Sequence, residues 1–278
     1  MSGGQAGGAL VTRLARGEDD LRAAQALRYR VFVQEMGADG PGIDHAAGLE
    51  ADPDDAAFDH LLLIDQRRAG KGTGADSCTG AGTGGPAPVV GVYRLLTDKA
   101  AAALGRFYGD SEYDLGPLRR SGRRLVELSR SCVHPDYRRG AAMLLLWQGL
   151  ADYVLARDIE IMFGVASFPG TDPARHAQAL SYLHHHHLAP AALRPRALSA
   201  CHHPMDLIPL QALDAAAAKA TIPALIRAYL RLGGFVGDGA FIDHPFNTID
   251  ICMVMDTAAM SQKHAGFYRR KAGKRGHE

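Results

Sequence analysis

Ionisable side chains suited to acid–base chemistry stand close together in the stretch VELSRSCVHPDYRRG, residues 126–140. Its first half is typical of a buried strand and carries Glu127 and Arg130. Burial raises the pKa of a carboxyl group and a neighbouring arginine lowers it, so such a carboxylate can act as a general base. We predict that Glu127 is a base and that Arg130 supports the same centre. The alternative is a structural pair, although residues three apart on a strand face opposite sides unless a bulge intervenes.

The second half of this stretch predicts an anion-binding loop in front of an apolar helix. Free backbone N–H groups at the start of a helix attract phosphate, and a glycine lets the backbone approach closely. Two arginines beside that glycine add charge-assisted hydrogen bonds. The predicted phosphate-binding residues are Arg138, Arg139, Gly140, Ala141 and Ala142. An ordinary basic turn between a strand and a helix is the alternative.

Charge is unevenly distributed in a chain whose net charge is only +1. Residues 50–59 hold five carboxylates and neither Lys nor Arg, whereas residues 119–124 (RRSGRR) hold four arginines. This pattern predicts one acidic pocket and at least two cationic faces, with solvated loops as the alternative. A nearly neutral chain argues against a strongly basic nucleic-acid-binding protein.

The bulk composition favours a globular enzyme-sized chain in a reducing compartment. The 278 residues, 47% of them hydrophobic, suffice for one large domain with or without an extension. The longest strictly apolar run, residues 143–147, is far too short for a membrane span, and no signal-peptide pattern opens the chain. The four cysteines are scattered without a C-x-x-C pair, which favours a reduced cytoplasmic protein.

Hydrophobic periodicity predicts a mixed α/β (α+β) domain built on one central mixed sheet flanked by helices. We expect strands at 10–15, 60–65, 89–96, 126–133, 159–168 and 248–255, and helices at 18–36, 141–156, 181–187 and 222–232. The helix at 141–156 is apolar almost all round and is therefore expected to be buried. Residues 1–9 should be a flexible leader and 10–200 the main domain, interrupted by a Gly-rich loop at 66–88. Residues 201–278 should be an extension on the same domain, with a basic tail at 263–278.

Two motifs point to cofactors that the context does not support. GAGTGG at 80–85 matches G-x-G-x-x-G, but prolines and a strand follow it, so no helix N-terminus is available for a dinucleotide. The run His184–His187 and the nearby Cys201-His202-His203 lack the i, i+4 or C-x-x-C spacing of zinc sites. We therefore expect neither a metal nor a bound cofactor.

The order strand, basic glycine loop and helix resembles the pantetheine-pyrophosphate loop of the GNAT acyltransferase superfamily. The frame Tyr137 to Ala142 departs from the usual Gln/Arg-x-x-Gly-x-Gly/Ala only in its first residue, which fits a carrier-bound phosphopantetheine rather than free coenzyme A. LRYRVFVQEMG, EADPDD, GVYRLL and ELSR resemble the branch that uses acyl carrier protein, as acyl-homoserine lactone synthases do. CVHPDYR, FGVASFPGTDP, ALSYLHHHHLAP and AGFYRR resemble the L-ornithine Nα-acyltransferases of bacterial ornithine-lipid synthesis, over about residues 10 to 270.

This resemblance implies transfer of a 3-hydroxyacyl group from acyl carrier protein to the α-amine of L-ornithine, forming lyso-ornithine lipid. The acidic segment (Glu50, Asp52, Asp55 and Asp59) would hold the side-chain ammonium of ornithine. Arg28, Arg94 or Arg130 would bind its carboxylate, with Phe32 sharing a helix face with Arg28. The alternative is that Arg28 and Arg94 pair with these carboxylates in a buried structural network, and both roles can hold at once.

The remaining implied features concern the oxyanion and the partners. Backbone N–H groups near residues 131–133 would polarise the thioester carbonyl, and Cys132 is expected to have no nucleophilic role. Arg119, Arg120, Arg123 and Arg124 would dock the acidic carrier protein, with Arg138 and Arg139 contributing. The helix at 222–232 and the basic tail could touch the inner membrane, although an ordinary core-facing helix is the favoured interpretation. The alternative functions are another carrier-dependent N-acyltransferase, such as an acyl-homoserine lactone synthase, and a non-enzymatic peripheral membrane protein.

Overall fold

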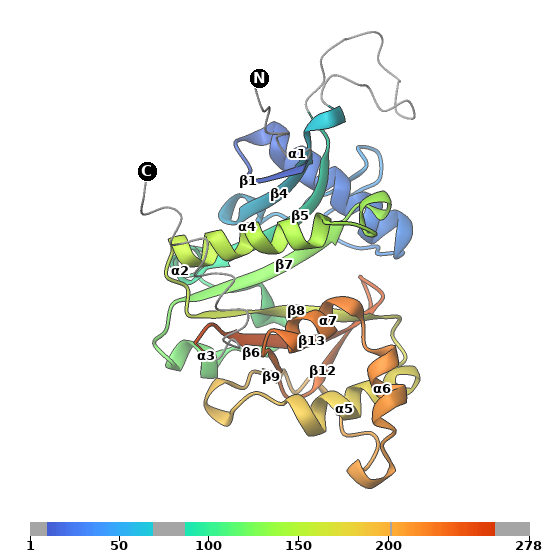
Figure 1. Cartoon of the computed structure of the whole chain (residues 1–278). Helices are drawn as coiled ribbons and strands as arrows, with labels where there is room; N and C mark the ends of the chain where they lie inside the picture. The colour runs from blue at the N-terminus through green and yellow to red at the C-terminus, as the bar shows by residue number, and fades with distance from the viewer. Residues whose placement is uncertain (1–9, 69–86, 201, 259–278) are drawn as a thin grey trace, which may run out of the picture. The chain divides into compact units, whose positions relative to one another are not determined.

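The computed structural model describes residues 10–68, 87–200 and 202–258 (Figure 1). Helices and strands alternate along the chain, which confirms the mixed α/β class. The chain divides into two compact units that interleave in sequence. The first unit comprises Met1–Glu35, Pro41–Arg94 and Arg130–Ala151, and the second comprises Met36–Gly40, Leu95–Ser129 and Asp152–Glu278. The second unit thus takes in residues on both sides of position 200, where we expected an extension to begin.

The first unit contains the strand order β1–β4–β5, with β1 antiparallel to β4 from Leu10↔Asp65 to Leu14↔Leu61. In Figure 1 these strands lie beside α1. The elements of the unit are β1 (Leu10–Leu14), α1 (Glu18–Arg28), η1 (Tyr29–Glu35), β2 (Ile43–Asp44), β3 (Leu49–Glu50), η2 (Asp55–Ala57), β4 (Asp59–Asp65) and η3 (Gln66–Arg68). It also holds most of β5 (Val89–Thr97), the end of β7 (Leu125–Val133), η5 (Pro135–Tyr137) and most of α4 (Ala142–Ala156).

The expected helix at 18–36 is present, but its second half is a π-helix. Three acidic residues in the first turn of α1, Glu18, Asp19 and Asp20, complement the helix dipole. The chain continues directly into the π-helical η1, and Gly37, at a φ of 77°, follows its end. π-Helical turns are rare and change the angular spacing of side chains. Helical periodicity counted from α1 therefore does not carry through to Phe32.

The second unit contains the strand order β7–β8–β13–β12–β10, with β11 paired to β13. The pair β7–β8 is parallel and the pairs that β13 makes with β8, β11 and β12 are antiparallel. Its strands are the start of β7, β6 (Tyr113–Asp114), β8 (Ile161–Pro169), β9 (Arg196–Ala197), β10 (His202–His203), β11 (Phe235–Val236), β12 (Ala240–Asp243) and β13 (Thr248–Asp256). Its helices are α2 (Asp98–Leu104), η4 (Tyr108–Ser111), α3 (Gly116–Arg120), η6 (Pro173–His176), α5 (Ala177–His187), η7 (Ala191–Leu193), η8 (Leu210–Ala212), α6 (Ala215–Thr221) and α7 (Ala224–Arg231).

Strand β7 is irregular where it passes from the second unit to the first. Its parallel register with β8 runs from Leu125↔Ile161 to Glu127↔Phe163. At Gly164, whose φ is 156°, a Cβ atom would lie 2.0 Å from the carbonyl oxygen of Leu128, so no other residue fits this close approach. Arg130 has a φ of 48°, which is uncommon for a residue other than glycine. Simple alternation of side chains therefore does not hold between Glu127 and Arg130.

Two expectations about helices resolve differently. Helix α4 is not buried all round, because Leu144 and Leu155 are 53% and 45% exposed. One side of this helix faces solvent although its residues are apolar. Helix α7 packs on β8 and β13 with Ile226 and Tyr229 buried, as expected for a core-facing helix. Its apolar face is therefore not free to enter a membrane. Among the described residues, no helix combines the length and apolarity that crossing a bilayer requires.

Several sequence expectations fall outside the described residues. The leader 1–9, the tail 263–278 and the G-x-G-x-x-G match at 80–85 all do so. Of the expected Gly-rich loop at 66–88, residues 66–68 form the 3₁₀ turn η3. The domain boundaries proposed from the sequence stay predictions.

Candidate active site

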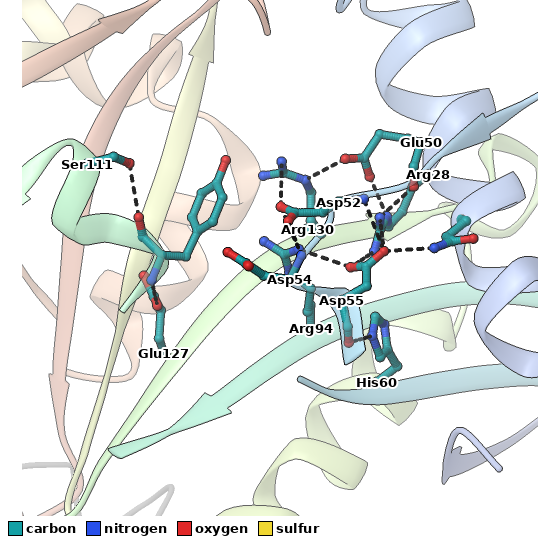
Figure 2. Close-up of polar contacts among 12 residues, drawn as sticks. Arg28, Glu50, Asp52, Asp54, Asp55, His60, Arg94, Ser111, Glu127 and Arg130 are labelled. Atoms are coloured by element: carbon teal, nitrogen blue, oxygen red, sulfur yellow. Dashed lines mark hydrogen bonds and ion pairs between the residues drawn. The ribbon is translucent and has the colours of Figure 1, made fainter. Parts of the chain in front are cut away.

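Six charged residues of the first unit form a buried arginine–carboxylate network (Figure 2). Its members are Arg28, Arg94, Arg130, Glu50, Asp52 and Asp55. They come from α1, β5, the end of β7, β3 and the turn that follows β3. The side chains of Arg28 and Arg94 are fully buried, and Arg130 is 11% exposed.

Arg28 is the centre of this network. Its two terminal nitrogens donate to both carboxylate oxygens of Asp55 at 2.8 Å, and its Nε donates to Glu50. Arg94 bridges Asp52 at 2.8 Å and Asp55 at 3.0 Å. Such planar, two-pronged contacts are the strongest geometry available to an arginine–carboxylate pair.

The neighbours of Arg28, Asp55 and Arg94 complete the network. Gln25 Nε2 donates to Asp55 Oδ2 at 2.9 Å, and His60 Nε2 lies 3.0 Å from the Asp55 carbonyl oxygen. Arg130 reaches Glu50 at 3.2 Å and Asp52 at 3.7 Å. The guanidinium of Arg94 also stacks over the ring of Phe58, 4.0 Å from its centroid.

The network balances three arginines against three carboxylates, which matches the structural alternative considered from the sequence. Burial alone would raise the pKa of Asp55, but the hydrogen bonds and charge of Arg28 outweigh it and hold that pKa well below its ordinary value. A free ammonium group would have to displace an arginine to reach Asp55. Substrate binding by Arg28, Glu50, Asp55 and Arg94 stays a prediction, and the arrangement favours a scaffold role for them.

The other expected members of the acceptor site lie outside the network. Phe32 is half-buried in the π-helical η1, and Asp59 is half-buried at the first position of β4.

Glu127 lies in the second unit, and both of its carboxylate oxygens are engaged by the main chain. Oε2 accepts the N–H of Tyr108 at 2.7 Å and Oε1 accepts that of Gly109 at 2.6 Å. Glu127 therefore anchors the start of η4, the turn that Ser111 closes by donating to the carbonyl of Tyr108 (Figure 2). A Cβ at position 109 would lie 2.9 Å from Oε1, so any other residue there would have to displace the Glu127 carboxylate. The carboxylate is 2% exposed and rigidly oriented, as a positioned base must be.

The segment predicted to bind phosphate lies between η5 and α4, and its phosphate-binding role stays a prediction. Arg139, Gly140 and Ala141 are exposed, and Ala142 is the first residue of α4. Arg138 is already paired: its guanidinium contacts both oxygens of Glu35, at 2.5 and 2.6 Å, and its Nε donates to the Val133 carbonyl. A phosphate would therefore compete with Glu35 for Arg138.

Tyr137 occupies the first position of the loop motif and contacts a carboxylate. Its hydroxyl donates to Asp65 Oδ2 at 2.7 Å, and Arg67 also contacts Asp65. The tyrosine thereby attaches the loop to the end of β4.

Three of the four arginines proposed to dock a carrier protein form ion pairs inside the second unit. Arg119 pairs with Asp110, Arg123 with Asp256, and Arg124 lies 3.8 Å from Glu160. Arg120 is exposed at the end of α3. The surface at 119–124 is thus less cationic than its sequence indicates, because acidic residues distant in the sequence neutralise it.

Sequence reasoning missed a second group of carboxylates, Glu112, Asp243 and Asp250, in the second unit. One oxygen of each lies within 4.8 Å of the other two. Glu112 and Asp250 are each 4% exposed, and Asp243 is half-buried. The available signal was Asp250, a carboxylate in the interior of the apolar strand TIDICMVMD, whose other carboxylate, Asp256, is its last residue. These residues are 7 to 138 positions apart in the chain, so no local pattern groups them.

The histidine run contributes to structure rather than to this carboxylate group. His185 Nε2 lies 2.9 Å from the Ile208 carbonyl, and His186 and His187 stack on Tyr182. In the first unit, burial raises the pKa of the Cys132 thiol to about 12, so it stays protonated. That protonation state fits the expectation that Cys132 is not a nucleophile.

Comparison with known proteins places these features in a family. Residues 27–148 match the family model described as an acetyltransferase (GNAT) domain. An L-ornithine N(alpha)-acyltransferase of Rhodobacter capsulatus is 57% identical over 264 residues, covering 95% of this chain and 96% of the relative. A protein of the same name from Agrobacterium fabrum is 41% identical, covering 94% and 85%.

Among solved structures, an N-acyl amino acid synthase from uncultured soil microbes aligns with a TM-score of 0.49 at 14% identity, over 90% of this chain and 91% of that one. The identity to the Rhodobacter protein extends over almost the whole of both chains, which far exceeds what a shared fold alone requires. The chain is therefore an N-acyltransferase enzyme, and it belongs to the family of the L-ornithine N(alpha)-acyltransferases.

Proposed function

We propose that the protein transfers a 3-hydroxyacyl group from an acyl carrier protein thioester to the α-amine of L-ornithine, giving lyso-ornithine lipid. The choice of ornithine as the acyl acceptor is supported by the 57% identity, over 95% of this chain, to a protein named L-ornithine N(alpha)-acyltransferase. The donor rests on the loop Tyr137 to Ala142, which departs from the pattern expected for free coenzyme A at its first residue.

In the proposed reaction the neutral α-amine nitrogen attacks the thioester carbonyl carbon. The C–N bond forms, the C–S bond breaks, and the phosphopantetheine thiolate leaves and takes up the proton that the acylated nitrogen gives up. Because the α-amine is protonated at neutral pH, a base must first accept a proton from it. Glu127, directly or through a water, is the proposed acceptor, because it is buried, fixed by two main-chain N–H groups and placed immediately before the irregular part of β7.

The other parts of the site have supporting roles. The loop Arg138 to Ala142 is proposed to hold the phosphate of the pantetheine arm, with Arg139 as the exposed cation. Backbone N–H groups at residues 131–133 are proposed to polarise the thioester carbonyl. The arginine–carboxylate network is proposed to fix the backbone around Arg130. No metal or cofactor beyond the thioester donor takes part in this scheme.

The carrier protein and the membrane are the proposed partners. Arg120 and Arg139 are exposed cations that an acidic carrier could contact, with Arg119, Arg123 and Arg124 supplying more charge if their ion pairs rearrange. The lipid product requires a membrane acceptor surface, and the basic tail 263–278 has the charge for an anionic one. A cytoplasmic protein with a peripheral contact to the inner membrane fits this scheme.

The test is incubation of the protein with 3-hydroxyacyl carrier protein and radiolabelled L-ornithine, followed by extraction into organic solvent. We expect label in a lipid that contains one amide-linked acyl chain. Parallel reactions with 3-hydroxyacyl coenzyme A and with S-adenosylmethionine as acceptor separate this function from coenzyme A-dependent and homoserine-lactone-forming enzymes. Absence of labelled lipid with every donor would overturn the proposal.

A further inference from the structure

We infer that Glu112, Asp243 and Asp250 bind the side-chain ammonium group of the amino-acid acceptor. This inference rests on the proposed acylation of ornithine. It places the binding site of the side-chain amine in the second unit instead of in the acidic segment 50–59. The three residues are called the acid triad below.

The acid triad has the geometry of an ammonium site. One oxygen from each residue lies within 4.8 Å of the other two. Three acceptors that each sit ~2.8 Å from one tetrahedral nitrogen are roughly 4.6 Å apart, and a primary ammonium group offers three N–H donors. Three ionised carboxylates drawn together in a buried place repel one another, and a cation bound between them would relieve that repulsion.

A fourth polar group, outside the triad, points to a ligand on the same face. Thr248 stands opposite Asp243 on the paired strands β12 and β13 and two residues before Asp250. Paired and alternate residues share a face of a sheet, so these three side chains lie on one side. The hydroxyl oxygen of Thr248 is buried, with the residue 2% exposed, and it has no hydrogen-bond partner among the described residues. Buried hydroxyl groups normally have a partner, and an ammonium group would supply one.

The triad is held rigidly and is connected to Glu127 by a single turn. Gly109 donates its N–H to Glu127, and its carbonyl accepts the N–H of Glu112 at 3.0 Å. The next residue, Tyr113, donates its hydroxyl to the carbonyl oxygens of Asp250 at 2.9 Å and of Gly239 at 3.1 Å. The candidate base and the triad are therefore parts of one preorganised structure, as two binding points for a short diamine must be.

Negative charges act on the buried groups beside the triad. Burial raises the pKa of Tyr113, and the nearby charges of Glu112 and Asp250 raise it further. Burial also raises the pKa of Cys252, with Glu127 and Glu112 adding to it. Glu127 and Glu112 thus both act on the pKa of the same buried thiol. The first-unit network contains three arginines, Arg28, Arg94 and Arg130, that pair with its carboxylates.

The experiment compares two acceptors that differ only in the side-chain amine, L-ornithine and L-norvaline. The variants are Asp250→Asn, Glu112→Gln, Asp243→Asn and Thr248→Val, each assayed with 3-hydroxyacyl carrier protein. Asp158→Asn is the matched control, because Asp158 is an exposed carboxylate of the same unit whose positive φ suits asparagine. Because Asp243 is only half-buried, the Asp243→Asn variant keeps the test valid if a substitution at one of the buried positions prevents folding.

We expect Asp250→Asn and Asp243→Asn to raise KM for ornithine at least about tenfold, with kcat within about threefold, while the control matches the wild type. The preference of the wild type for ornithine over norvaline should shrink by a similar factor in these variants. An equal loss with both acceptors would show a purely structural role and overturn the inference, as would an unchanged KM for ornithine. Ornithine turnover that is lost in EDTA and restored by Mg²⁺ or Ca²⁺ would assign the triad to a metal and also overturn it. If the wild type acylates no amine at all, the proposed function fails instead.

Discussion

The two units contain contrasting groups of buried charge. In the first unit, three arginines and three carboxylates bind one another in the arginine–carboxylate network. In the second unit, three carboxylates converge in the acid triad, and Glu127 accepts hydrogen bonds from two main-chain N–H groups. A balanced network stabilises a backbone arrangement, whereas a group of like charges is suited to attracting a cation. The contrast teaches that acidic residues clustered in sequence need not be the ones that meet a cationic substrate.

The largest expected effect tests whether the network is a scaffold. Arg28→Ala leaves Glu50 and Asp55 buried without their main partner, which costs about 3–5 kcal/mol in the free energy of unfolding. Urea denaturation followed by circular dichroism measures this loss. Arg22→Ala, on the exposed side of the same helix, is the control and should change stability by less than about 0.5 kcal/mol. A loss in Arg28→Ala as small as that of the control would remove the scaffold interpretation.

The next effect concerns Glu127. Glu127→Gln keeps the size of the side chain but cannot accept a proton, so turnover should fall about 10²–10⁴-fold. Binding of the acyl carrier protein, measured by surface plasmon resonance, should be retained. Ser111→Ala removes only the hydroxyl that closes the same turn and should keep nearly full turnover. Equal loss of carrier binding and turnover in Glu127→Gln would count against the base assignment and leave Glu127 as an anchor of η4.

A pH series refines the picture of the first unit. Burial lowers the pKa of His60 below 6.5, so the folded state keeps it neutral while the unfolded chain takes up a proton. Because the unfolded state then binds more protons, stability falls as pH drops below about 6.5, by at most about 1.4 kcal/mol per pH unit for this group. Urea titrations between pH 7.5 and 5 should show a smaller slope in His60→Gln, and an unchanged slope would mean that His60 titrates normally.

The same linkage applies to the carboxylates of the network at lower pH. The pKa of Asp52 and that of Asp55 lie below 3.8 in the folded state, because the arginines outweigh burial. Their contribution is present above the unfolded pKa and is lost as pH falls through the folded values. The stability that these carboxylates contribute should therefore be lost only in strong acid. Loss of that contribution already near pH 5 would contradict the charge balance of the network.

The smallest effect concerns the phosphate loop. Glu35→Gln removes the exposed partner of Arg138, whose ion pair is worth about 0–1 kcal/mol. Releasing Arg138 should lower KM for the acyl carrier protein a few-fold and leave the melting temperature almost unchanged. Arg139→Ala should act in the opposite direction and weaken the salt dependence of donor binding. A higher KM in Glu35→Gln would show that the pair positions Arg138 rather than competes for it.

Local patterns determined much of the fold. Alternating or continuous apolar runs marked β4, β5, β7, β8 and β13, and their periodicity needs only neighbouring residues. The two-residue strand β9 was missed because a long-range hydrogen-bonded pairing with β6 defines it, and the five-residue helix α3 was missed because it is too short to show a periodic pattern. The buried side of α4 was misjudged because composition does not say which face has a partner.

The sequence by itself determined the family, the strand–loop–helix order around Gly140 and the concentration of acids at 50–59. Only the tertiary structure decided that three of those acids pair with Arg28, Arg94 and Arg130, and that Arg138 pairs with Glu35. It also assembled Glu112, Asp243 and Asp250, which arrive from a turn and two paired strands. The physical reason is that charge compensation acts through space between residues distant in sequence, so composition reveals the charges but not their partners.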